Sequence, residues 1–168
     1  FARQSDQTKK EIDIKKPLFD VFKLIGKQLI KRKITVETNI EDNLPPILAD
    51  HNKLEQVFLN IIANARDAID ELRIKSPDKK DGKITINAYC LKDTVVIEII
   101  DNGIGISEKV KEKVFEPFFT TKDVDKGTGL GLSITYGIVK EFNGIIDIES
   151  KEMQGSKFII KFPAHIIC

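Results

Sequence analysis

The stretch from Asp50 to Leu72 carries the pattern that most constrains the fold of this chain. At about 100° per residue, apolar side chains fall on one arc of a helical wheel. They are Leu54, Phe58, Ile61, Ala65, Ile69 and Leu72. This spacing predicts a long amphipathic helix, and Asp50 is a suitable N-cap for it. The fold must therefore bury one side of a long helix.

Shorter patterns on both sides of this helix predict alternating strands and helices. Pro17 is expected to start a helix whose apolar stripe is Leu18, Phe22, Ile25 and Leu29. A further helix is expected at about 130–142. Strands are expected around Ile12 and Ile14 and at 34–40, 84–90, 95–100, 145–149 and 157–162. Residues 102–127 are long and irregular with one short helical pattern, in which Ser107 is a cap and Val110 and Val114 are buried. Such a loop inside a compact domain is typical of a functional lid or of disorder.

Composition describes one ordinary globular domain. The chain has 168 residues, 41% of them hydrophobic and 32% charged, with a formal net charge of +1. This balance does not favour contact with nucleic acid or with an anionic membrane. No apolar stretch approaches the roughly 20 residues that span a bilayer, and no signal peptide is apparent. Two cysteines without metal-ligand spacing suit a reducing compartment. We expect a cytoplasmic domain, whose parent protein could still be membrane-bound.

Polar residues form a narrow stripe beside the apolar arc of the long helix. Asn60, Asn64 and Asp67 follow one another at i, i+4 and i+7. A solvated polar edge would explain the stripe, but asparagine is a poor helix former. The other interpretation is metal ligation, because an amide oxygen suits a hard cation that also binds phosphates and water. The stripe alone does not decide between them.

A second polar motif, 101–105, ends a strand. Asp101 has the same parity as Val95, Ile97 and Ile99, so its carboxylate is expected to point into the core. A buried acid needs a partner. The exocyclic amine of a purine would be one, and glycines at 103 and 105 would let a flat ring approach the backbone. A polar strand end followed by a glycine turn remains the alternative.

A third motif, Gly127-Thr128-Gly129-Leu130-Gly131, opens the predicted helix at 130–142. Backbone amides at a glycine-rich helix N-terminus form an anion site that a triphosphate could fill. The chain lacks the strand that leads into a Rossmann turn, and it lacks the Walker lysine. A hinge for a flexible lid is the alternative. Lys122 and Lys126 precede the motif and could reach phosphate oxygens, and three phenylalanines at 115–119 could pin the segment.

In this order, the motifs resemble the four sequence boxes of the histidine-kinase catalytic domain. That domain belongs to the ATPase superfamily shared with gyrase and the heat-shock chaperones. Residues 60–65 match the N box, 101–105 the first glycine box, 115–119 the F box and 127–132 the second glycine box. The resemblance spans roughly residues 12–163. It implies an α/β (α+β) two-layer sandwich, with a mixed, mostly antiparallel sheet of about five strands on three helices and a long ATP lid at about 102–130.

The resemblance also implies ATP and Mg2+ as ligands and assigns roles to residues. Asn64 would ligate the metal, with Asn60 beside it, and Asp101 would bind the adenine amine. The other nucleotide-binding positions would be Gly103, Gly105, Gly127, Thr128, Gly129, Leu130, Gly131 and Leu132. Asp67 stands where many histidine kinases have lysine, which makes Lys122 the expected phosphate-contacting lysine. We assign catalytic roles to Asn60 and Lys122, and nucleotide-binding roles to Asp67 and Lys122.

One departure from the chaperone and gyrase branch bears on the reaction. That branch has a glutamate general base four residues before the metal asparagine, where this chain has Asn60. An amide cannot take a proton near neutral pH, so efficient ATP hydrolysis is not expected. Transfer of the γ-phosphoryl group to an incoming side chain, leaving ADP, fits better. Asn60 or Gln56 could orient that nucleophile.

The phosphoacceptor implied by the resemblance is not recognisable in the chain. Its two histidines, His51 and His165, lack the acceptor context and are expected to be ordinary surface residues. We expect residues 1–11 to be a remnant of a dimerisation hairpin and its linker, and 12–168 to be the ATP-binding domain. The expected partners are the histidine-bearing hairpin and a response regulator receiver domain, with this fragment itself monomeric. A serine-directed kinase of the same superfamily and a non-catalytic nucleotide sensor are the alternatives.

Overall fold

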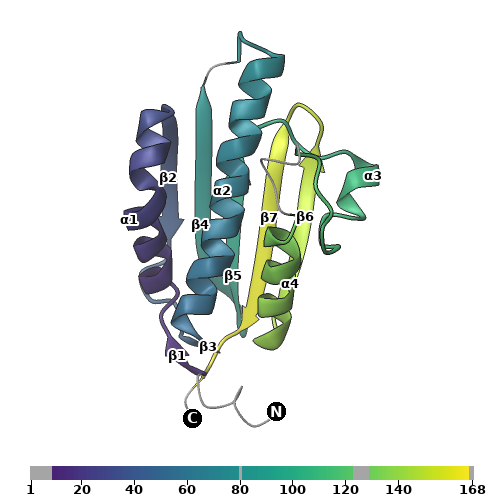
Figure 1. The fold of residues 1–168 in the computed structure, drawn as a ribbon. Coiled ribbons are helices and arrows are strands. Elements are labelled where there is room, and N and C mark those ends of the chain that lie inside the picture. The colour runs from purple at the N-terminus through teal and green to yellow at the C-terminus, as the bar shows by residue number, and fades with distance from the viewer. Residues whose placement is uncertain (1–8, 80, 123–128, 167–168) are drawn as a thin grey trace.

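A computed structural model describes residues 9–79, 81–122 and 129–166 of the chain. Figure 1 shows helices α1, α2 and α4 in front of a sheet, with α2 between the other two. The helices are α1 (Lys15–Lys31), α2 (His51–Lys75), α3 (Glu108–Lys111) and α4 (Gly131–Glu141). The strands are β1 (Lys10–Ile12), β2 (Ile34–Ile40), β3 (Ile47–Ala49), β4 (Gly82–Leu91), β5 (Thr94–Asp101), β6 (Ile145–Lys151) and β7 (Gly155–Pro163).

The main sheet has the topology expected for the two-layer sandwich. Among the described residues its five strands follow the order β2-β4-β5-β7-β6. Strands β2 and β4 run parallel, whereas the other neighbouring pairs are antiparallel. The predicted mixed, mostly antiparallel sheet is therefore confirmed. A separate pair, β1 with β3, was not expected as a second sheet, because strands of three residues leave little periodicity to detect.

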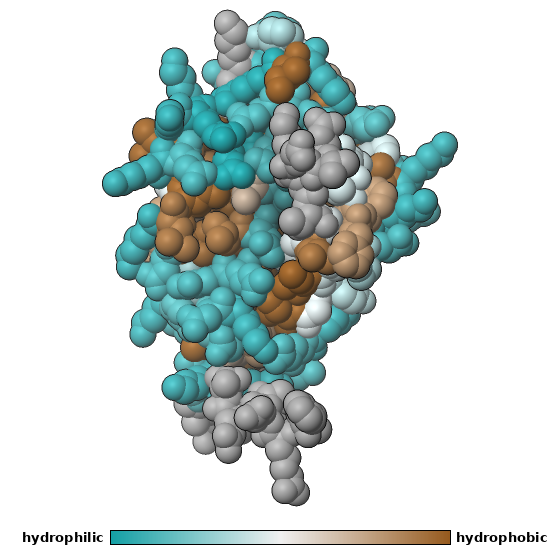
Figure 2. Space-filling view, in the orientation of Figure 1, coloured by the Kyte–Doolittle hydropathy of each residue, from teal (hydrophilic) through white to brown (hydrophobic). Residues whose placement is uncertain are grey.

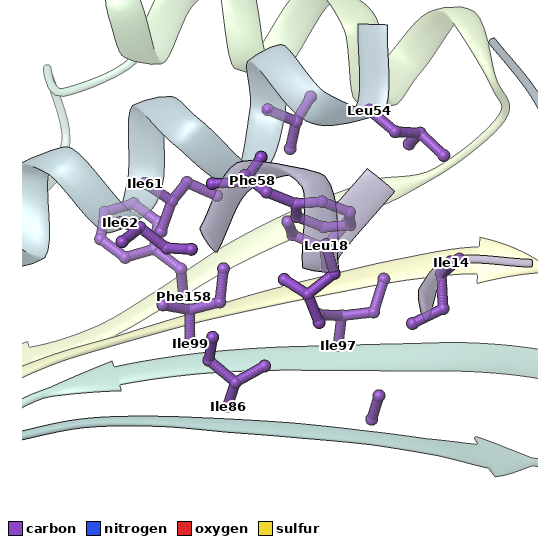
Figure 3. Packing of buried hydrophobic residues seen from close by; sticks show 14 of the residues in the cluster. Ile14, Leu18, Leu54, Phe58, Ile61, Ile62, Ile86, Ile97, Ile99 and Phe158 are labelled. Atoms are coloured by element: carbon purple, nitrogen blue, oxygen red, sulfur yellow. The ribbon is translucent and has the colours of Figure 1, made fainter. Parts of the chain in front are cut away.

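The core lies between the helices and one face of the sheet. Along β5, Val95, Ile97 and Ile99 are buried and alternate with positions on the opposite face, as their parity predicted. Figure 3 shows side chains of the helices, such as Phe58, above Ile97 and its neighbours in the sheet. The sheet thus provides a broad apolar floor for the helices.

Helix α2 is the central element of the helical layer. All six side chains of its predicted apolar arc are buried. Asp50 caps its first turn, because its Oδ1 accepts a hydrogen bond of 2.9 Å from the Lys53 N–H. Near its other end, Arg73 donates to the carbonyls of Arg32 and Lys33 at 2.7 and 3.1 Å. The helix is therefore fixed at both ends.

The segment after β5 is mostly irregular, as predicted, and contains the four-residue helix α3 capped by Ser107. Val114 is buried, but Val110 is only half-buried, so that part of the prediction was wrong. Two of the three phenylalanines pack inward. Phe115 lies against the Tyr136 ring, with 5.3 Å between ring centroids, and Phe119 is half-buried. Phe118 is 75% exposed and does not pin the segment. Residues 123–128 lie outside the described part of the chain.

The outer surface of the helical layer is largely polar, with apolar patches between polar side chains (Figure 2). On α1 the exposed apolar side chains are Phe19, Leu24 and Ile30. No helix in the described ranges is long and apolar enough to cross a bilayer.

Truncating the centre of the core should have a large effect on stability. Phe58 is fully buried, at 0% exposure, whereas Phe19 is 52% exposed. Phe58→Ala should lower the free energy of unfolding by about 3–5 kcal/mol through lost burial and a residual cavity. Urea denaturation followed by circular dichroism would measure it. The matched control Phe19→Ala should change the value by about 0.5 kcal/mol or less. Equal effects in the two variants would contradict the described core.

Candidate functional site

A cavity of about 380 Å³ lies between α2, the ends of β5 and β7, the segment after β5 and the start of α4. Nine of the predicted site residues line it. They are Asn60, Asn64, Asp67, Asp101, Gly105, Lys122, Gly129, Gly131 and Leu132. Gly103 and Leu130 are close in sequence to lining residues but do not line the cavity themselves. Gly127, Thr128 and Lys126 lie outside the described residues. Motifs from four separate stretches of sequence therefore meet at one cavity.

Asp101 contributes a buried carboxylate at the end of β5. It is 5% exposed and faces the same side as Val95, Ile97 and Ile99, as predicted. Burial raises its pKa to about 6, although hydrogen bonds from the backbone N–H groups of Gly103 and Ser156 act in the opposite direction. The Gly103 N–H lies 2.8 Å from Oδ1. Two backbone donors hold the carboxylate at the cavity wall, where a ligand with an amine could add a further hydrogen bond.

The two glycines after Asp101 are required by packing. A Cβ atom on Gly103 would lie 2.5 Å from the carbonyl carbon of Ala68 in α2. Gly105 has φ +73°, and a Cβ atom there would collide with the carbonyl of Lys151. The adjacent Ile104 N–H donates to the Ala68 carbonyl at 2.9 Å. These contacts join the loop after β5 to α2 and to the β6–β7 turn. The glycines are therefore needed for packing within the protein, besides leaving the backbone open to a purine ring.

Asn60 joins α2 to the start of α4. Its Nδ2 donates to the Gly131 carbonyl at 3.1 Å and to Thr135 Oγ1 at 3.3 Å. Thr135 is fully buried, so this side-chain contact gives its hydroxyl a partner. The mid-helix asparagine therefore has a structural role.

Asn64 and Asp67 both contact the ammonium group of Lys122. Nζ lies 3.4 Å from Asn64 Oδ1 and 2.6 Å from Asp67 Oδ2. The second oxygen of Asp67, Oδ1, is 2.9 Å from Arg66 Nε. Partial burial alone would raise the pKa of Asp67, but the hydrogen bonds and charges of Lys122 and Arg66 outweigh it and lower that pKa. The sequence did not predict the ion pair between Asp67 and Lys122 or the contact between Asp67 and Arg66.

The start of α4 has the geometry of an anion site. Leu130 provides no side-chain cap to this helix, and Gly131 and Leu132 of its first turn line the cavity. The first N–H groups of a helix lack partners within the helix and carry partial positive charge. Gly129 has φ +70°, and a Cβ atom there would collide with the backbone of Phe118. The described part of the glycine run therefore packs against the segment after β5.

Comparison with known families decides the relationship. Residues 49–166 match the histidine kinase-, DNA gyrase B-, and HSP90-like ATPase family. The chain belongs to this ATPase family. Sensor kinase CckA of Brucella abortus is 38% identical over 169 residues, covering 97% of the chain and 18% of CckA. The chain thus spans about a fifth of that relative.

Solved structures agree with this relationship. The catalytic domain of histidine kinase ThkA is 30% identical, with a TM-score of 0.78, and the match covers 93% of the chain and 95% of that domain. The structure of ThkA in complex with the response regulator protein TrrA matches with 26% identity and a TM-score of 0.73, covering 94% of the chain and 42% of that ThkA chain. The expected family and fold are confirmed. The chain is an ATP-binding catalytic domain of the histidine-kinase type.

Several residues that line the cavity were not expected from the sequence. Ser156 and Phe158 of β7 line it, because they pair with Asp101 and Ile99 of β5. Phe158 belongs to a predicted strand, but no local pattern specifies which strand is its neighbour. Thr120, Thr121 and Glu71 also line the cavity. Their polar side chains were indistinguishable in sequence from solvated surface.

The two histidines lie away from the residues that line the cavity. His51 is half-buried, with Nε2 at 3.0 Å from Asp20 Oδ2 and 2.9 Å from Glu55 Oε1. Lys23 also pairs with Asp20, at 2.6 Å. His165 pairs with Glu11 at 3.1 Å. Each histidine therefore contacts a carboxylate from another part of the chain.

The buried carboxylate of Asp101 predicts a specific pH dependence of stability. Its pKa in the folded protein is about 6, above the ordinary value of 3.8. The protonated carboxyl therefore contributes its full stabilisation of the folded state below about pH 3.8. This contribution is lost as pH rises toward 6, at roughly 1.4 kcal/mol per unit, or roughly 3 kcal/mol in total. Without nucleotide, Asp101→Asn should therefore be more stable than the wild type at about pH 8 and gain little at about pH 4.

Urea denaturation of both proteins across this pH range would measure the difference. Asp147→Asn, on the exposed β6 edge, is the control and should follow the wild type. A stability difference between Asp101→Asn and wild type that does not vary with pH would contradict the strongly raised pKa.

Proposed function

We propose that the cavity binds Mg-ATP and that the domain transfers the γ-phosphoryl group to a histidine on a dimerisation hairpin outside this chain. One observation carries the proposal. A single cavity combines the buried Asp101 carboxylate with the Asn64 and Lys122 pair, and the N-terminus of α4 lines the same space. Asp101 would accept a hydrogen bond from a purine amine, Asn64 and Lys122 would contact the metal and the phosphates, and the N-terminus of α4 would bind the phosphate anion.

Adenine recognition rests on Asp101. The carboxylate already accepts from Gly103 and Ser156 N–H groups, which fix its orientation. An ionised carboxylate has further lone pairs, so it can also accept from the exocyclic amine of adenine. Gly103 supports this arrangement through Asp101 and the packing on α2, whereas Gly105 lies at the cavity itself. Guanine has a carbonyl at the corresponding ring position, which favours ATP over GTP.

Magnesium fits the donor set around Asn64. Its Oδ1 lies 3.4 Å from the Lys122 ammonium, so this amide oxygen is oriented toward a cation. Amide oxygens, waters and phosphate oxygens are ligands that Mg2+ prefers. When bound, the metal would neutralise charge on the phosphates during transfer. Gly129, Leu130, Gly131 and Leu132, with Gly127 and Thr128 beyond the described residues, would provide backbone groups for the phosphates.

The reaction type follows from Asn60. Its amide cannot act as a base, and its Nδ2 group is engaged by Gly131 and Thr135. Water activation at this position is therefore not expected. Instead, an imidazole nitrogen would form the new bond to the γ-phosphorus while the bond to the β–γ bridging oxygen breaks, leaving ADP. Lys122 would stabilise the phosphoryl charge, and Asn60 would hold α4 in place beside it.

We further propose the setting of the domain. Residues 1–11 would be the end of a hairpin helix and linker, and residues 12–168 the ATP-binding domain with a lid at about 102–130. A response regulator receiver domain would take the phosphoryl group from the hairpin, which the ThkA–TrrA complex supports. The domain would act in the cytoplasm and be monomeric without its hairpin.

Loss of either the proposed adenine contact or the proposed metal ligand should weaken Mg-ATP binding. Asn64→Ala and Asp101→Asn should each raise the dissociation constant about tenfold, because the first removes a ligand of the metal and the second removes the charge from the acceptor of the adenine amine. Isothermal titration calorimetry would measure the constants. Glu55→Gln, on α2 but outside the cavity, is the control and should bind normally. Unchanged affinity in both site variants would refute the assignment.

Transfer itself can be tested with a separately produced histidine-bearing hairpin and radiolabelled ATP. Label should move to the hairpin in a form that is lost in acid, as expected for phosphohistidine. Acid-stable label would indicate a serine-directed kinase, and tight nucleotide binding without any transfer would indicate a sensing module. Either of these results would contradict the proposed reaction.

A further inference from the structure

We propose that Asp67 is a positioning residue that holds the Lys122 ammonium over Asn64, and that it contacts no part of the nucleotide itself. The inference rests on the proposed function of this site and specifies how its phosphate-contacting lysine is placed. It changes the role of Asp67 from a nucleotide ligand to an anchor for another side chain.

The geometry of one helical face carries the inference. Asn64 and Asp67 are three residues apart on α2, so their side chains are neighbours. One ammonium group contacts both, at 3.4 Å from Asn64 Oδ1 and 2.6 Å from Asp67 Oδ2. The shorter contact is with the carboxylate, which is therefore the stronger anchor of the two.

Both oxygens of Asp67 are already occupied by cations. Oδ2 accepts from Lys122, and Oδ1 lies 2.8 Å from Arg66 Nη2 and 2.9 Å from its Nε. A carboxylate without these partners would repel a triphosphate in the same cavity. With them, its charge is offset, and the phosphate oxygens of a nucleotide offer no donor for its remaining lone pairs. Asp67 thus fits the role of an anchor better than that of a ligand.

Lys122 needs such an anchor because of its position in the chain. It lies outside every described helix and strand, and its own N–H is held locally by Thr120 Oγ1 at 3.0 Å. Asn64 is positioned by α2, whereas the Lys122 side chain is positioned by its ion pair. The side chains of the pair are 31% and 30% exposed, so solvent screens it less than a fully exposed pair.

The inference predicts selective losses of affinity. Asp67→Asn and Lys122→Ala should each weaken Mg-ATP binding about tenfold, because each removes the placed charge. Neither should change the affinity for adenosine, which has no phosphates. The double variant Asp67→Asn/Lys122→Ala should bind Mg-ATP no more weakly than Lys122→Ala alone, because the two residues act as one unit. Calorimetric titration with both ligands would measure this.

Reversing the pair provides a sharper test. Lys122→Asp alone should weaken Mg-ATP binding, but the double variant Asp67→Lys/Lys122→Asp should return to within about threefold of wild type. A lysine on α2 would then be held by a carboxylate from the segment after β5. Glu55→Gln remains the control for a lost carboxylate elsewhere on α2, and thermal unfolding would verify that every variant is folded.

The outcomes separate this inference from the proposed function. Equal losses for Mg-ATP and adenosine in Asp67→Asn, additive losses in the double variant, or no recovery on reversal would each overturn the positioning role. If Asn64→Ala and Lys122→Ala lose affinity while Asp67→Asn does not, the inference fails and the proposed function stands. If none of these variants differs from wild type, both fail.

Discussion

The close approach of α2 to the loop after β5 is the contact on which the rest of the site depends. The absence of a side chain at Gly103 lets this loop lie against Ala68, and the Ile104 N–H donates to the Ala68 carbonyl at 2.9 Å. Because the apolar arc of α2 faces the sheet, its neighbouring polar stripe faces the cavity. Asp101 and Asn64 thereby line one space, although they come from different layers of the sandwich. Any larger side chain at position 103 would separate them.

The site contains one carboxylate, Asp101, that is costly to keep ionised without a ligand. Asp101 is buried among backbone donors, and its raised pKa shows that ionisation is unfavourable there. Asp67 and Lys122 line the cavity as an ion pair, and Arg66 contacts the second oxygen of Asp67. The domain therefore gives up some stability to keep Asp101 at this position, as functional sites commonly do, whereas the lowered pKa of Asp67 shows that its charge is favoured by its partners. The well-packed core under α2 supplies the stability that this arrangement requires.

Much of the fold could be predicted from the sequence because its periodic patterns are long. The α2 arc, the Asp50 cap and the parity of Asp101 on β5 each followed from local spacing, and each is confirmed. Contacts between distant elements were not predictable in this way. The pairing of Ser156 with Asp101 depends on strand register, and the tie between Asn60 and Thr135 depends on how α4 docks. Phe118 shows that a local pattern can also mislead. An aromatic residue in an apolar cluster was expected to be buried, but its side chain is exposed.

A structure of the domain with Mg2+ and a non-hydrolysable ATP analogue would test the central claim most directly. That claim is that one nucleotide bridges Asp101 and Asn64 across the described cavity. The account predicts the adenine amine within hydrogen-bonding distance of the Asp101 carboxylate and Asn64 Oδ1 in the coordination sphere of the metal. An analogue bound elsewhere, or one whose purine faces away from Asp101 while its metal does not contact Asn64, would contradict it.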